Sequence, residues 1–103
     1  MTFTIQDLKA LKENDGATLE NYSPVTYKNG YQVGITGIET TDINTAYAAI
    51  EQYNGTCGVW YAGGVYYIDY SIMIENEREA IETGRKHKQI SILKWSDMSL
   101  IYC

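Results

Sequence analysis

The sequence predicts a single α+β domain with an antiparallel sheet, and three observations support this prediction. Aromatic and β-branched residues are concentrated in Gly64–Ile74, as is typical of a strand. A similar run, Gly30–Thr40, occurs earlier in the chain. Each run is followed by a segment with the apolar periodicity of an amphipathic helix. A chain of 103 residues is long enough for one hydrophobic core and too short for two.

The N-terminal segment predicts an additional helix. Thr4 is the expected N-cap, and Asp7 stands three residues later, at the acidic position of a capping box. Phe3 and Leu8 have the spacing of a hydrophobic staple. We expect this helix to extend to about residue 14 and to end where Gly16 adopts a left-handed conformation.

The next segment predicts a β-hairpin. Asn29-Gly30 is the strongest turn signal in the chain, because both residues tolerate the positive φ angles of a type I′ turn. We therefore expect Val25–Lys28 to pair with Tyr31–Ile38. Gly34 and Gly37 lie inside the second of these strands, which indicates a bulge or a close approach of another backbone.

An internal repeat, in which Gly30 aligns with Gly64, organises the rest of the chain. Each repeat contains a strand, a helix cap, an amphipathic helix and a short strand. The predicted helices cover Ile43–Asn54 and Glu77–Lys88, with Asn76 as the N-cap of the second. We expect Ile50 and Ile81 to lie in the core. The alternative is a chance alignment of two amphipathic helices.

Two such units in series give the order β-α-β-β-α-β, which is the split-βαβ or ferredoxin-like order. The predicted divisions of the single domain are an N-terminal helix and first hairpin strand (1–28), two βαβ units (30–61 and 64–95) and a C-terminal strand (96–103). Gly30–Ile38 and Gly64–Tyr70 would be the central strands. Cys57–Tyr61 or Ser99–Cys103 would be open edges that pair across a two-fold axis, so both a monomer and a homodimer are expected states.

Charge and aromatic residues are unevenly distributed. Between Asn29 and Glu77 the chain has six acidic residues and no lysine or arginine. Such an acidic segment disfavours direct nucleic-acid binding, because that affinity comes largely from neutralising phosphates. The chain also has ten tyrosines and one phenylalanine, and tyrosine suits half-exposed interfaces. The alternative is that the acidity only maintains solubility.

No motif in the sequence predicts catalysis, a metal or a cofactor. His87 is the only histidine, and Cys57 and Cys103 are too far apart in sequence for a metal-ligand motif. We expect Cys57 to be a small buried core residue with a protonated thiol. The chain shows no leader and no run of about 20 apolar residues, so it is expected to be cytoplasmic and not to bind membranes.

The C-terminal half carries a resemblance to a class of proteins. The segments GVWYAGGVYYIDYS and EAIETGRKHKQISILKW resemble short, uncharacterised proteins encoded by phages and other mobile elements of Gram-positive bacteria. This resemblance implies a small protein that acts in a host cell by binding a host or defence protein, as anti-CRISPR proteins bind CRISPR effectors. No catalytic motif comes with the resemblance, so it assigns no functional residues.

Three functions remain as hypotheses. The first is a non-enzymatic module that binds a basic protein partner through an acidic, tyrosine-rich surface. The second is a small-ligand or nucleotide-binding module at a dimer seam, and the third is an enzyme, which the lack of a nucleophile–base pair disfavours. For the first, the candidate contact residues lie within the lysine-free segment. They are Glu39, Glu51, Trp60, Tyr66, Asp69, Tyr70 and Glu75.

Overall fold

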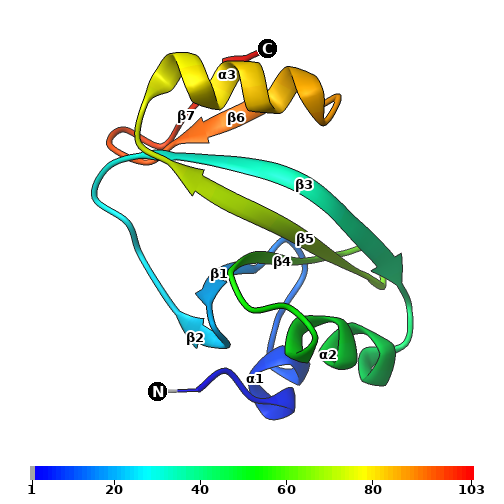
Figure 1. Cartoon of the computed structure of the whole chain (residues 1–103). Helices are drawn as coiled ribbons and strands as arrows, with labels where there is room; N and C mark the ends of the chain where they lie inside the picture. The colour runs from blue at the N-terminus through cyan, green and yellow to red at the C-terminus, as the bar shows by residue number, and fades with distance from the viewer. Residues whose placement is uncertain (1) are drawn as a thin grey trace. The chain divides into compact units, whose positions relative to one another are not determined.

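The computed structural model describes residues 2–103 and is α+β (Figure 1). Three helices occur in these residues: α1 (Ile5–Lys9), α2 (Ile43–Glu51) and α3 (Glu77–Lys86). The strands are β1 (Gly16–Glu20), β2 (Ser23–Pro24), β3 (Tyr31–Thr40), β4 (Thr56–Ala62), β5 (Val65–Ile74), β6 (Ser91–Lys94) and β7 (Ser99–Tyr102). They form a seven-stranded antiparallel sheet in the order β2-β1-β4-β5-β3-β6-β7. None of the described helices is long and apolar enough to cross a membrane.

The element order of the predicted repeat is confirmed. The same offset in sequence separates the starts of β3 and β5, at Tyr31 and Val65, and the starts of α2 and α3, at Ile43 and Glu77. Asp42 and Asn76 cap the two helices by accepting a hydrogen bond from the backbone N–H three residues later. β3 and β5 are the longest strands, and they occupy neighbouring interior positions in the sheet, as expected.

The chain forms two compact units, each with its own buried cluster. Unit 1 contains residues up to 25 and residues 37–70, and unit 2 contains residues 26–36 and 71–103. The buried apolar residues form two clusters, whereas the sequence predicts a single core. β3 and β5 each contribute residues to both units. The apolar side chains of β5 are divided between the two clusters, whereas the β3 residues Tyr31 and Val33 belong to the cluster of unit 2.

Unit 1 buries apolar side chains between its two helices and one face of its strands. α1 and α2 pack against each other and lie on the same side of β4 (Figure 1). The largest fully buried side chains of this cluster are Leu8, Leu19, Ile50, Ile68 and Cys57. Phe3 is buried with Leu8, as the predicted staple requires. Thr4 and Asp7 form the predicted capping box.

The helix α1 is shorter than the sequence predicts. It ends at Lys9, and Gly16 begins strand β1 instead of capping the helix. Backbone hydrogen bonds between Asn14 or Asp15 and Tyr61 extend the pairing of β1 with β4. These bonds satisfy backbone groups that a longer helix would have used internally. Asn14, with φ 67°, makes the left-handed bend.

The first hairpin also differs from the prediction. β1 and β2 are joined by Asn21 and Tyr22, whose φ angles of 47° and 70° are those of a type I′ turn. The Tyr22 hydroxyl donates a hydrogen bond to the Glu51 carbonyl and lies 2.8 Å from Asn54 Oδ1. These contacts hold a residue without strong turn propensity in the turn. Residues 25–28 form no strand.

In unit 2, the strand that follows Asn29-Gly30 pairs with β6. Tyr31 lies opposite Lys94, and the Trp95 backbone N–H donates to the Gly30 carbonyl. The Trp95 indole N–H donates to Gln32 Oε1, and the Gln32 amide donates to the Ser71 hydroxyl. Gly30 has the expected positive φ, but its carbonyl accepts the hydrogen bond from the Trp95 N–H, and the predicted hairpin does not form there.

Helix α3 covers the apolar side of unit 2 (Figure 1). Val33, Ala80 and Ile92 form the buried cluster, and half-buried Ile81 packs against it. β7 pairs antiparallel with β6, as predicted for the C-terminal residues. The prediction that Cys57–Tyr61 is an open edge was wrong, because β1 pairs with β4 along this segment.

Burial predicts a difference between two matched substitutions in the helices. Ile50→Ala should lower the free energy of unfolding by about 2–5 kcal/mol, because a fully buried side chain leaves a cavity. Ile81→Ala should cost clearly less, because Ile81 already contacts water. Urea denaturation monitored by circular dichroism measures both. Equal losses would contradict the difference in packing between these positions.

Candidate functional site

The strands of unit 1 have one face toward the helices and one face away from them. Cys57 and Val59 of β4 and Ile68 of β5 point into the helix-covered cluster. Because side chains alternate along a strand, Trp60 of β4 and Tyr67 and Asp69 of β5 point to the opposite face. Neither helix of unit 1 covers that face.

What we call the outer patch consists of Trp60, Tyr67 and Asp69 on this face, together with Glu39 of β3, whose charge acts on Asp69. Its aromatic half is the contact between Trp60 and Tyr67, whose ring centroids are 5.1 Å apart at an interplanar angle of 31°. Trp60 is 45% exposed, the largest side chain among the exposed hydrophobic residues of unit 1. An exposed aromatic pair of this kind offers contact area at a low cost in conformational entropy.

The acidic half of the outer patch consists of Glu39 and Asp69. Partial desolvation raises the pKa of the Asp69 carboxyl, and the nearby Glu39 carboxylate raises it further. Neither carboxylate forms a salt bridge with any of residues 2–103. Both carboxylates lie in the lysine-free segment, which supplies no cationic side chain of its own.

A glycine on the neighbouring strand makes room for Asp69. A Cβ atom at Gly37 would lie 2.5 Å from the Ile68 carbonyl oxygen and 2.7 Å from Asp69 Oδ1. Only a residue without a side chain fits this approach of β3 to β5. The prediction of a close backbone approach is therefore confirmed at Gly37.

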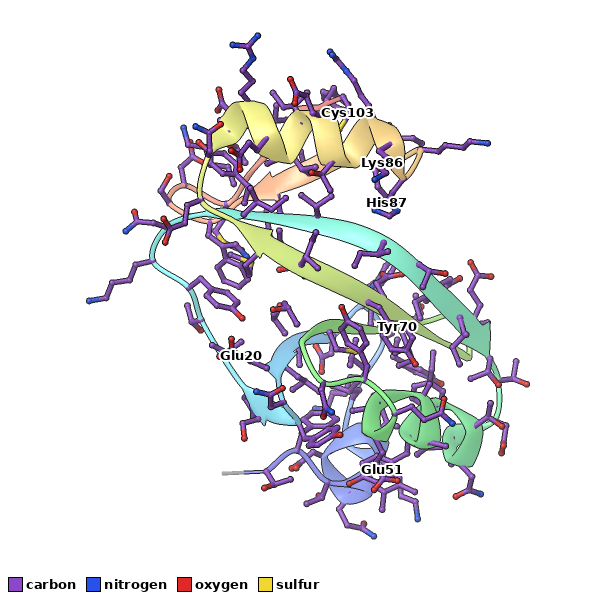
Figure 2. All side chains as sticks on the ribbon, viewed as in Figure 1. Glu20, Glu51, Tyr70, Lys86, His87 and Cys103 are labelled. Carbon is purple, nitrogen blue, oxygen red and sulfur yellow. The ribbon has the colours of Figure 1, made fainter. Side chains whose placement is uncertain are left out.

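The structure places the other candidate residues elsewhere. Tyr70 points toward α2, as Figure 2 shows, and its hydroxyl donates a 2.6 Å hydrogen bond to the Ala49 carbonyl. Tyr66 packs against the same cluster. Glu51 is exposed at the end of α2, and Glu75 is exposed in unit 2, before α3. Only Glu39, Trp60 and Asp69 of the predicted contact residues come together.

Tyr67 was missing from the predicted contact residues. The signal for it was present, because Tyr67 and Asp69 are two residues apart in a strand and therefore share a face. The sequence did not predict the partner of its ring, since Trp60 lies on a different strand.

Cys57 and His87 have structural surroundings. Burial raises the pKa of the Cys57 thiol to about 12, and the Asp69 charge adds to this effect, so the thiol is protonated at neutral pH. Cys57 is buried in the core of unit 1, as predicted. His87 is the C-cap residue of α3. Across residues 2–103, no group of three or more histidine, cysteine, aspartate or glutamate side chains could hold a metal ion.

The two units differ strongly in charge. Unit 1 has eight acidic and two basic side chains, a net charge of −6, and unit 2 has five acidic and six basic side chains, a net charge of +1. Together these give the net charge of −5 of the chain. The outer patch therefore lies on the unit whose net charge is negative.

Comparisons of the chain with protein-family models, with curated proteins and with solved structures give no match.

The close approach at Gly37 predicts the effect of two glycine substitutions in the same strand. Gly37→Ala should lower the free energy of unfolding by about 1–3 kcal/mol, because the new methyl group meets a backbone carbonyl. Gly34→Ala is the control, because its Cβ would meet only the flexible Gln89 side chain, 3.0 Å away. Gly34→Ala should change stability by at most about 1 kcal/mol. Similar denaturation curves for the two variants would show that β3 does not approach β5 as closely as described.

Proposed function

We propose that the protein is a non-enzymatic binding module that docks a basic protein partner on the outer patch. The observation that supports this most directly is the contact of exposed Trp60 with Tyr67, on the same face as the Asp69 carboxyl and near Glu39, neither of which has a cationic partner in the described residues. Binding interfaces commonly combine aromatic anchors with complementary charge.

The energetics of Asp69 support a cationic contact from the partner. Desolvation and the Glu39 charge both disfavour the ionised carboxylate. An arginine or lysine from a partner would favour the ionised form and reverse this effect. An arginine suits the patch best, because its planar guanidinium pairs with carboxylates and stacks on aromatic rings such as Trp60.

The charge of unit 1 supports the same choice of partner. A net charge of −6 on this unit attracts a basic surface over a distance of about one Debye length, roughly 8–10 Å at physiological salt. Such steering raises the association rate more than it lowers the dissociation rate. The partner class follows from the resemblance to phage and mobile-element proteins, which makes a host-defence protein such as a CRISPR effector the proposed target.

We also propose the finer description of the fold, a ferredoxin-like split-βαβ arrangement. It is supported by the chain order β3-α2-β4-β5-α3-β6 and by the sheet order β4-β5-β3-β6. In this order β5 separates the two strands joined by α2, and β3 separates the two strands joined by α3. The split arrangement requires one intervening strand between the two strands of each strand–helix–strand segment.

Two charge reversals of the same size test the proposed function. Wild type, Asp69→Lys and Glu51→Lys are each used to capture proteins from bacterial lysate, and association rates of a captured protein are then measured over a salt series. Asp69→Lys should slow association about tenfold or more, because it places a positive charge against a basic surface. Glu51→Lys is the control, because Glu51 is exposed in the same unit but lies outside the patch.

For wild type, the association rate should fall as salt rises. A partner that binds Asp69→Lys and Glu51→Lys equally well would contradict the outer patch as the docking surface. A partner whose association is indifferent to salt would contradict the choice of a basic surface.

A further inference from the structure

The C-terminal strand β7 is an open edge with apolar side chains exposed to water. It is the last strand in the sheet order and pairs only with β6. Leu100 is 58% exposed and Tyr102 is 72% exposed. Ile101, between them, packs against the cluster under α3. Ser99–Tyr102 has no charged residue and no proline, the features that usually protect an edge strand.

The other edge of the sheet is protected. β2 has only two residues, and one of them is Pro24, which has no backbone N–H to offer a second strand. The two edges therefore differ in their capacity to pair, and β7 is the edge with free pairing groups.

The pairing with β6 determines which backbone groups of β7 point outward. The Cys103 N–H donates a hydrogen bond to the Ile90 carbonyl, so the backbone groups of Cys103 point toward β6. In an antiparallel ladder this direction alternates along the strand. Ile101 and Ser99 therefore also point toward β6, and Leu100 and Tyr102 direct their N–H and C=O groups to the open edge.

We propose that two copies of the chain form a homodimer by antiparallel pairing of β7 with β7 across a two-fold axis at Ile101. In this register Leu100 lies opposite the partner's Tyr102, and these two residues exchange backbone hydrogen bonds. Leu100 and Tyr102 have both outward backbone groups and exposed apolar side chains. This one register therefore pairs their backbone groups and also covers part of their apolar surface. A register centred on Leu100 would place Tyr102 opposite the partner's Met98, which has φ 57° and lies in the turn before the strand.

Charge supports a second copy as the occupant. Self-association brings identical charges together, so it is favoured where few charges lie. Unit 2 has a net charge of +1 and β7 has no charged side chain, whereas unit 1 has a net charge of −6. In the proposed register every directly opposed pair in the seam is uncharged.

Charge substitutions at the two opposed positions test both the dimer and its register. Wild type should sediment as a dimer at micromolar concentration. Leu100→Glu alone and Tyr102→Lys alone should each raise the dissociation constant about tenfold or more. Leu100→Glu combined with Tyr102→Lys places opposite charges across the seam and should restore dimerisation. The matched control, Leu100→Lys combined with Tyr102→Lys, places like charges there and should give monomers.

A disulfide supplies a second measurement of the register. A two-fold axis at Ile101 places Ser99 opposite the partner's Cys103, as a close non-hydrogen-bonded pair. Ser99→Cys should therefore give a covalent dimer on mild oxidation, and adding Cys103→Ser should abolish it. Within one chain the two positions are four residues apart on a strand, too far for a disulfide. A monomeric wild type, or a dimer that neither the charge variants nor Ser99→Cys affects as described, would overturn the proposal.

Discussion

At Gly37, strand β3 passes β5 so closely that a Cβ atom would lie 2.5 Å from a backbone carbonyl. The geometry of unit 1 depends on this approach. It brings β3 alongside the segment of β5 whose inward side chain, Ile68, is fully buried. It also leaves space above Gly37 for the Asp69 carboxyl, and Glu39 follows two residues later on β3. A packing constraint thus positions the Asp69 carboxyl on the face of the Trp60–Tyr67 pair, where the Glu39 charge acts on it.

This arrangement does not favour the stability of the folded chain. A carboxyl group such as Asp69, whose pKa is raised by desolvation and by the nearby Glu39 charge, is unfavourable for an isolated unit in its ionised form. A large aromatic side chain left partly in water is also unfavourable. Elsewhere the polar groups of unit 1 are well satisfied, as the Tyr22 and Tyr70 hydroxyls show by their hydrogen bonds to backbone carbonyls. The ionised Asp69 carboxylate in the outer patch is therefore electrostatically unfavourable, and a bound cationic surface would offset this effect.

The sequence predicts the repeating elements well because their signals are local. The caps at Asp42 and Asn76, and the strand runs that follow Gly30 and Gly64, depend on neighbouring residues. The mistakes arose where a tertiary contact overrides a local signal. Asn29-Gly30 has the local signal of a hairpin turn, but the hairpin forms at Asn21-Tyr22. Hydrogen bonds from the Tyr22 hydroxyl to residues about thirty positions away hold that turn. For the same reason the sequence does not predict that Tyr67 joins Trp60 on the outer face or that Tyr70 packs against the buried cluster of unit 1, because these positions depend on which face each strand buries.

The most direct test of this account is an NMR titration of the side-chain carboxyl groups in wild type and in Glu39→Gln. Asp42 is an internal reference, because hydrogen bonds from Thr45 lower its pKa. Asp69 should titrate above its ordinary pKa of 3.8 and clearly above Asp42, and Glu39→Gln should lower the Asp69 pKa without moving that of Asp42. An Asp69 pKa at or below 3.8, or one that Glu39→Gln leaves unchanged, would show that the two carboxylates do not share the outer patch.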